Sequence, residues 1–213
     1  MPFEDVWMGT VQKNNPNISV LDARQGLTLR EMEPAGGHHH DFDHHDHHHE
    51  EGGADPHIWL DPANVRIMIG YLRDRLIELD PANAAAYKEN HDRFKQELLA
   101  LEEEIHTLLQ PLEGRSFMVF HPSWGYFADA FGLRQVSIES EGKEAGARTL
   151  TRLMEQAKRE RVQVIFVQQQ FSRDQAATLA SAMGARLVTL NPLAESYLDN
   201  LRQVARSISE AYQ

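Results

Sequence analysis

The sequence predicts an α/β protein with two lobes of parallel βα units joined by a long spine helix, the N-terminal lobe being incomplete. Strand and helix patterns alternate through the C-terminal half, one helical stripe precedes them, and the first part of the chain holds a single strand pattern. We therefore predict a partial N-terminal lobe at 1–80 with a His-rich loop at 36–53, a linking long helix at 81–110 and a C-terminal α/β lobe at 111–213.

The predicted N-terminal lobe begins with a short amphipathic segment from Phe3 to Val11 and a strand at 17–21, where the sequence reads NISVL. A helix is expected from Pro62 to about Leu79, because Asp61 is a favoured N-cap and proline a favoured first helical residue. No cationic start followed by an apolar core precedes PFEDVW, so we expect the sequence to begin inside a longer protein that carries the signal segment.

The spine helix is predicted to start at Asp80 and Pro81, because this second Asp-Pro pair again supplies an N-cap and a first helical residue. From Tyr87 to Leu108, apolar residues together with His91 follow at alternating spacings of four and three. A helix from about Pro81 to Gln110 is roughly 45 Å long. Gly132 and Gly184 each follow the end of a predicted helix, where a residue with left-handed backbone conformation is common. The C-terminal lobe is expected to contain strands at 117–120, 135–138, 162–167 and 186–190, and helices at 124–131, 147–161, 174–183 and 194–212.

Composition excludes several classes of protein. The 213 residues include 21 Lys and Arg against 32 Asp and Glu, a net charge of −11 that argues against nucleic-acid partners and against anionic lipid. No apolar run approaches the roughly 20 residues of a membrane span, so direct membrane insertion is not expected. Cysteine is absent, which excludes disulfides, thiolate metal sites and a cysteine nucleophile.

Histidine is concentrated in one tract, which holds eight of the 12 histidines interleaved with acidic residues. We interpret it as a secondary metal loop, because dense imidazole and carboxylate suit Zn(II), Ni(II) or Cu(II) far better than Mg or Ca; Mn(II) also stays open. The alternatives without a metal-binding function are an expression tag and a solvated linker. The predicted ligands of this loop are His38, His39, His40, Asp41, Asp43, His44, His45, Asp46, His47, His48 and His49.

Two isolated histidines are candidate metal ligands. His57 lies between two Asp-Pro pairs just before a helix start, and His121 follows the apolar strand FMVF, at the strand end where open α/β sheets bind ligands. Zinc needs three or four donors, so a further ligand is required. The candidates near strand ends are Glu139, Glu141, Glu144 and Asn191, whereas His91 and His106 on the spine helix are expected to be structural.

Several motifs together carry a family resemblance: PFEDVW, DPHIWLDPANV, FMVFHPSWGYFADAFGL, IESEGKEAGA, VIFVQQQFS and LVTLNPLA, around an acidic His-rich insertion. The chain resembles the zinc/manganese class of solute-binding proteins of bacterial ABC transporters, in its zinc-uptake branch. The resemblance covers nearly all of the chain.

The resemblance implies a periplasmic or otherwise extracytoplasmic protein that captures Zn(II) between two lobes and delivers it to an ABC transporter membrane permease. It matches His57 and His121 to two of the family's three histidine ligands, and it places Asn191 where the family usually carries Asp. The segment that holds the family's first histidine ligand precedes PFEDVW, so we expect it to be missing. A monomer is expected, or a swapped dimer if the chain is truncated.

Two rival functions remain open. A metal-storage or buffering protein would act through the His-rich loop, with the lobes as scaffold. A metal-dependent hydrolase would use Glu139 or Glu141 as general base beside a metal-bound water. The motifs HExxH, GxSxG and GxxxxGK[ST] are absent, so the sequence predicts no enzyme.

Overall fold

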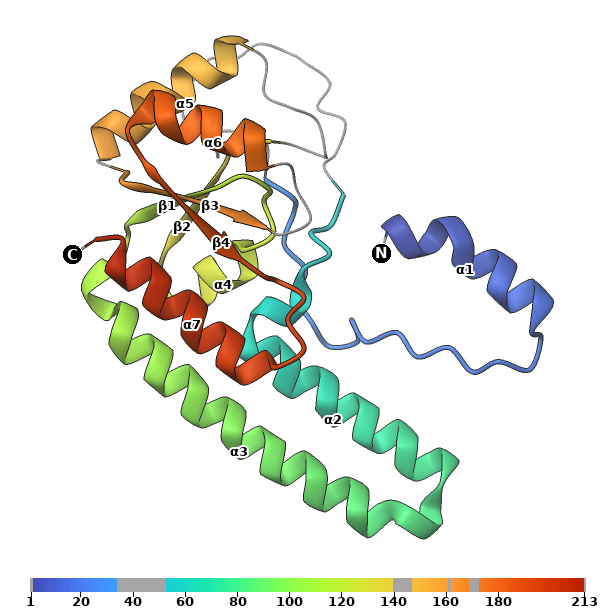
Figure 1. The fold of residues 1–213 in the computed structure, drawn as a ribbon. Helices are drawn as coiled ribbons and strands as arrows, with labels where there is room; N and C mark the ends of the chain where they lie inside the picture. Colours follow the sequence, from blue (N-terminus) through green and yellow to red (C-terminus); the bar gives the residue numbers. More distant parts are fainter. Residues whose placement is uncertain (1, 34–52, 140–146, 161, 169–172, 213) are drawn as a thin grey trace.

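The computed structural model describes residues 2–33, 53–139, 147–160, 162–168 and 173–212. Within them, the strands form one four-stranded parallel sheet in the order β2-β1-β3-β4 (Figure 1). The strands are β1 (Ser116–Val119), β2 (Arg134–Ser137), β3 (Val164–Gln168) and β4 (Arg186–Leu190). The predicted βα alternation of the C-terminal half is confirmed.

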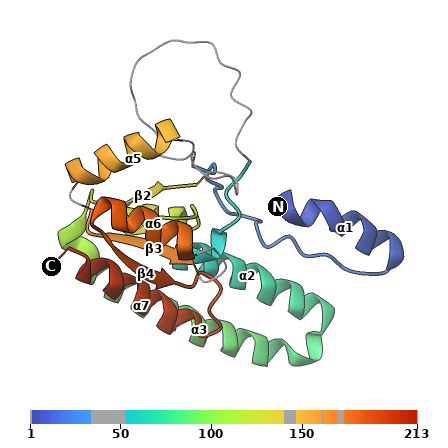
Figure 2. The same ribbon diagram turned by 45° about the horizontal axis from the view of Figure 1, so that its top comes forward.

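Helices cover both faces of this sheet, as Figures 1 and 2 show. One face packs on α5 (Ala147–Glu160) and α6 (Arg173–Met183), and the other on α4 (Gly125–Ala130), α7 (Tyr197–Glu210) and the end of α3 (Ala84–Leu109). Successive side chains of β1 alternate between the two cores: Phe117 faces the α3 and α7 side and Met118 the α5 and α6 side. Burial on both faces explains why β1 and β3 are mostly apolar.

Predicted and observed bounds of the spine helix and of the C-terminal elements agree to within three residues. The predicted start of α2 (Pro62–Leu79) is also confirmed, because the Asp61 carboxylate accepts a hydrogen bond from the backbone N–H of Ala63 at 2.7 Å. Gly132 and Gly184 both have φ of 67°, the left-handed conformation that their positions after α4 and α6 require.

The long helix α3 forms in two differently packed halves. Its C-terminal half buries Leu98, and it buries Leu101, Ile105 and Leu109 against the sheet and α7. Its N-terminal half pairs with α2 in a hairpin that extends away from the sheet (Figure 1). A 3-10 turn at Pro81–Asn83 joins the two helices, so the predicted continuous helix starts at Ala84. The division of the chain into two lobes stays a prediction.

The predicted strand at 17–21 is wrong. Residues 15–30 form turns and irregular backbone after α1 (Pro2–Asn14), with Ile18 and Val20 exposed. Strand propensity alone does not make a strand, which needs a neighbour to pair its backbone. Outside the sheet, the described residues show only the short antiparallel bridge between Glu31 and Ala54.

None of the described helices combines the length and the apolar character that crossing a membrane requires.

Candidate metal centre

His121 lies at the carboxyl end of the sheet, as the sequence predicts. It follows β1 after Phe120, and the turn that carries it is closed by a hydrogen bond from the Ser123 N–H to the His121 carbonyl at 2.8 Å. The side-chain amide of Gln168, at the end of the neighbouring β3, donates to the same carbonyl at 3.2 Å and also to the Ser123 hydroxyl. Two strand ends therefore fix the backbone of His121.

His57 reaches the same place from the segment that leads into α2. The 3-10 turn Ile58–Leu60 follows it, and Leu60 is buried in the core beneath the sheet. The Trp59 indole donates to the Pro192 carbonyl at 2.9 Å, and the Tyr197 hydroxyl donates to the Trp59 carbonyl at 2.8 Å. These contacts dock the residues around His57 against β4 and α7.

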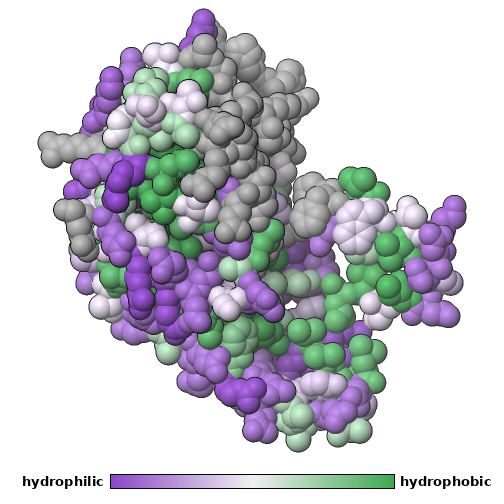
Figure 3. All heavy atoms as spheres, viewed as in Figure 1, coloured by the Kyte–Doolittle hydropathy of each residue, from purple (hydrophilic) through white to green (hydrophobic). Residues whose placement is uncertain are grey.

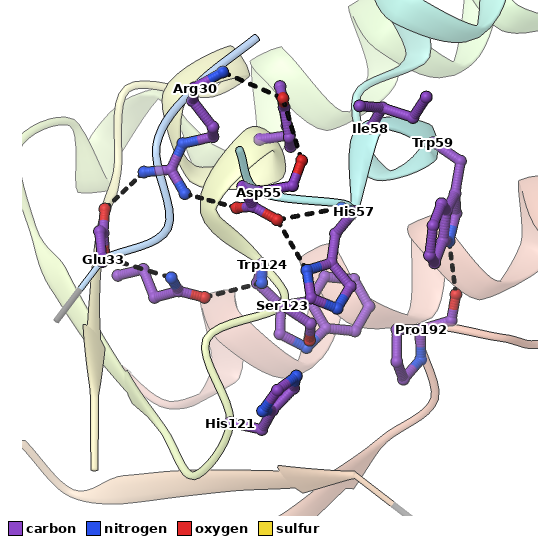
Figure 4. Close-up of polar contacts among 12 residues, drawn as sticks. Arg30, Glu33, Asp55, His57, Ile58, Trp59, His121, Ser123, Trp124 and Pro192 are labelled. Carbon is purple, nitrogen blue, oxygen red and sulfur yellow. Dashed lines mark hydrogen bonds and ion pairs between the residues drawn. The ribbon is translucent and has the colours of Figure 1, made fainter. Parts of the chain in front are cut away.

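The two imidazole rings lie close together (Figure 4). The ring centroids of His57 and His121 are 5.4 Å apart, with the ring planes at 76°. Two imidazoles that share one tetrahedral zinc ion at the usual Zn–N distances have centroids roughly 5 Å apart. The observed separation therefore fits two ligands of one transition-metal ion.

Each imidazole is backed by a buried carboxylate. The Nδ1 atom of His57 lies 2.7 Å from Oδ1 of Asp55, whose side chain is 0% exposed, and Nδ1 of His121 contacts Oε1 of the buried Glu139. A carboxylate accepts the hydrogen from Nδ1, so in this tautomer the lone pair is on Nε2. Metal-binding histidines in proteins are commonly held in this way.

Asp55 is not among the site residues that the sequence predicted, although a signal was present. Asp55 stands two residues before His57, and its Oδ1 atom also accepts from the backbone N–H of His57 at 3.0 Å. Asp residues commonly hydrogen-bond the backbone two residues ahead, so the DPH sequence already indicated this turn.

The predicted further ligands have mixed outcomes. Glu139 contacts Nδ1 of His121, and the Asn191 side-chain oxygen accepts from the backbone N–H of Leu193 at 3.0 Å. Glu141, Glu144 and the predicted ligand loop His38–His49 lie outside the described residues. Among the residues that are described, no three His, Asp or Glu side chains are grouped so as to hold a metal ion. The structure thus brings two predicted ligands together and leaves the remaining donors open.

The two histidines expected to be structural lie away from this centre, on α3. His91 is packed between α2 and α3, with its ring nitrogens 3.1 and 3.2 Å from Nη1 of Arg73. His106 is exposed near the end of α3.

Comparisons with known proteins agree on one family. The family model described as the periplasmic component A of zinc-uptake complexes, ZnuA, matches residues 1–211. The chain is similar to the high-affinity zinc uptake protein ZnuA of Bacillus subtilis (strain 168), with 33% identity over 141 residues that span 65% of this chain and 44% of the relative. For the ZnuA of Paracoccus denitrificans (strain Pd 1222), identity is 40% over 90 residues, 42% of this chain and 28% of the relative. The chain thus aligns with less than half the length of these two curated relatives.

Solved structures give the same result over more of the chain. A crystal structure of ZnuA superposes with a TM-score of 0.87 at 38% identity, covering 99% of this chain and 77% of that one. A zinc-bound ZnuA deletion mutant superposes with a TM-score of 0.85 at 37% identity, covering 98% and 75%.

Proposed function

Because the chain belongs to the periplasmic zinc-uptake family, we propose that it captures Zn(II) outside the cytoplasm and delivers it to the membrane permease of an ABC transporter. His57 and His121 would hold the ion through their Nε2 atoms. The observation that carries this proposal is the pair of imidazoles 5.4 Å apart, each backed by a buried carboxylate. In this proposal the centre binds a transported ion and carries out no chemical step.

The two carboxylates would contribute without contacting the ion. By accepting the Nδ1 hydrogen, Asp55 and Glu139 favour the tautomer whose lone pair is on Nε2, and they make that nitrogen a stronger donor. Both carboxylates are buried, so the rings are held in place before the metal arrives. A preorganised pair binds more tightly than two mobile side chains, because less rotamer entropy is lost.

The His-rich tract supports a second role. Its eight histidines at 38–49 offer many overlapping donor pairs, which would raise the local metal concentration without fixing one geometry. If this tract alone binds metal, the protein is a metal-storage or buffering protein and the α/β region is its scaffold. Stoichiometry distinguishes the two functions.

The deciding experiment is a Zn(II) titration of the metal-free protein by calorimetry at neutral pH. The variants are the double substitution His57→Ala and His121→Ala, a deletion of 38–49, and His106→Ala as the matched control for losing an exposed histidine elsewhere. The double substitution is expected to abolish a tight site of about one ion, whereas the loop deletion lowers stoichiometry and keeps that site. Undiminished tight binding in the double substitution contradicts the proposal, and loss of all binding with the loop favours the buffer.

Delivery to the permease requires a separate test. We expect zinc uptake by cells that lack this protein to be restored by the unaltered protein and by His106→Ala. The double substitution of His57 and His121 should leave uptake at the level of the deficient cells. Restored uptake by the double substitution would show that transport does not depend on the two histidines.

A further inference from the structure

A buried guanidinium adjoins the candidate metal centre. The Arg30 side chain is 14% exposed and contacts three carboxylates. Its Nη1 lies 2.9 Å from Oδ2 of Asp55 and its Nη2 contacts Glu33 (Figure 4). Its Nε lies 3.0 Å from Oδ2 of Asp129. Although burial alone would lower it, the pKa of Arg30 is raised above its ordinary value by Glu33 and Asp129. Arg30 therefore remains a cation among these acids.

Arg30 and His57 share one carboxylate. Oδ1 of Asp55 accepts from His57, and Oδ2 accepts from Arg30. The Asp55 side chain is 0% exposed, and a fully buried carboxylate is costly unless a cation or several donors compensate it. A neutral imidazole compensates only part of that charge. Arg30 thus stabilises the ionised Asp55 that orients the His57 ring.

The backbone around Arg30 reinforces this link. The Asp55 N–H donates to the Arg30 carbonyl at 2.9 Å, and the Arg30 N–H donates to the Tyr126 hydroxyl oxygen at 3.0 Å. The Met32 N–H donates to the Gly53 carbonyl at 3.1 Å. Segments 30–32 and 53–55 therefore lie side by side.

One glycine makes room for the guanidinium. A Cβ atom at Gly125, the first residue of α4, would lie 1.4 Å from Nη1 and 2.2 Å from Cζ of Arg30. Any larger residue would displace Arg30 from Asp55. The absence of a side chain at Gly125 therefore leaves the space that the Arg30 guanidinium occupies.

We propose that Arg30 is a positioning residue for zinc capture, which acts through Asp55 to hold the His57 imidazole facing His121. This inference rests on the proposed function, since it assigns a role to Arg30 at the same site. Arg30 also contacts Asp129 in α4, so the guanidinium ties the segment that carries His57 to the C-terminal α/β region that carries His121. Its removal should weaken zinc binding without removing a ligand.

The test compares Arg30→Gln with Arg30→Lys, Gly125→Ala and a matched control, Arg66→Gln. Arg66 makes a similar partly buried ion pair with Glu102, between α2 and α3. Zinc affinity is measured by chelator competition, and the geometry of the site by the visible absorption of bound Co(II). We expect about 10- to 100-fold weaker binding and an altered Co(II) spectrum for Arg30→Gln and Gly125→Ala. Arg30→Lys should recover part of the affinity, and Arg66→Gln should bind as the unaltered protein does.

A double-mutant cycle separates positioning from general destabilisation. If Arg30 acts through Asp55, then Arg30→Gln should weaken zinc binding much less when Asp55→Asn is already present. Additive effects of the two substitutions would overturn the proposal, as would an unaltered affinity and Co(II) spectrum in Arg30→Gln. Should Arg30→Gln fail to fold, the Arg30→Lys and Gly125→Ala proteins decide by the same readouts.

The same measurements distinguish this inference from the proposed function. If the His57→Ala and His121→Ala double substitution abolishes the tight site while Arg30→Gln leaves it intact, the positioning role alone fails. If the double substitution also leaves the tight site intact, the two-histidine site itself fails.

Discussion

The C-terminal sheet region and the N-terminal region bury their apolar side chains very differently. Among the described residues, eight of the ten large hydrophobic side chains that are exposed precede residue 80. Figure 3 shows such hydrophobic surface on the side where α1 and α2 lie. In the sheet region, Trp124, Phe127 and Phe166 are almost completely buried. Large apolar side chains are buried where helices cover the sheet, and they are exposed where no described element covers them. Burial of these side chains should therefore make the sheet region contribute most of the free energy of unfolding.

The largest expected effect is the loss of a core aromatic residue. Phe127 is 0% exposed and packs against Trp124 and Phe131, with ring centroids 5.9 and 4.8 Å away. Phe127→Ala should lower the free energy of unfolding by about 3–5 kcal/mol, because it removes buried apolar surface and leaves a cavity. Urea denaturation followed by circular dichroism measures this change.

The matched substitution lies on α2. Leu72 is 45% exposed, so Leu72→Ala should change the free energy of unfolding by no more than about 0.5 kcal/mol. A cost of several kcal/mol would break the comparison, since it would mean that this face of α2 is covered in solution, as in a swapped dimer. Sedimentation of the unaltered protein would then decide whether a second copy covers it.

The second-largest effect is expected from alkaline pH, which should lower the stability of the sheet region. Burial raises the pKa of Tyr212 to about 12, and it also raises the pKa of Tyr197; both side chains pack on the core that α7 shares with α3. The unfolded chain loses these protons from about pH 10, whereas the folded protein keeps them. Stability is therefore fully present below pH 10 and is lost as the pH rises toward 12.

The expected loss through Tyr212 is on the order of 2 kcal/mol at pH 12. Urea denaturation at pH 9 and pH 11 measures the slope. Tyr212→Phe should flatten it, and so should Tyr197→Phe. An equal slope in all three proteins would mean that the buried tyrosines are not responsible.

The sequence predicted α2 and the sheet region well because their signals are local. Asp61 and Pro62 start α2, and glycine follows α4 and α6, wherever those residues occur in a chain. The strand end after β1 also predicted the place of His121. The strand at 17–21 failed because pairing depends on a neighbour that propensity does not supply.

The support of the site could not be predicted in this way. Arg30 is 25 residues from Asp55 and 99 residues from Asp129, and no periodicity joins such positions. Their contact exists only once α4 and the 27–33 segment have come together. The pairing of His121 with Glu139 likewise follows from β1 and β2 lying side by side.

Backbone strain at two glycines should change stability by about 1–2 kcal/mol. Gly184 has φ of 67° and no atom near a substituted Cβ, so Gly184→Ala should cost about 1–2 kcal/mol from conformation alone. Gly26, in the N-terminal region, has φ of 83° and only Ile67 Cγ2 at 3.4 Å, so alanine meets the same strain there. If the N-terminal segment opens independently, Gly26→Ala should scarcely change global unfolding, although its local cost is similar. Equal global costs would show that both regions unfold together.

The smallest effect on stability is expected at Asp22, in the turn that follows residues 17–21. Its carboxylate accepts from the Arg24 side chain at 2.8 Å and from the Arg24 N–H at 3.0 Å, and the hydrogen bond from that side chain lowers the pKa of Asp22 to about 2. A lowered pKa gives stability that is present above about pH 4 and lost as the pH falls toward 2. The Asp22 side chain is 45% exposed, so solvent screening limits the gain to a few tenths of a kcal/mol.

Asp22→Asn should therefore leave global unfolding almost unchanged at pH 7 and speed hydrogen exchange of the turn. The amides to follow are those of Gln25 and Leu27, which donate to the carbonyls of Asp22 and Arg24. Faster exchange confined to these amides is what an independently opening segment requires, because a local contact protects only the local unit. If Asp22→Asn instead lowered the global free energy of unfolding by more than about 1 kcal/mol, the N-terminal turn would be part of the same cooperative unit as the sheet. The exposed apolar side chains before residue 80 would then belong to a segment as firmly held as the core.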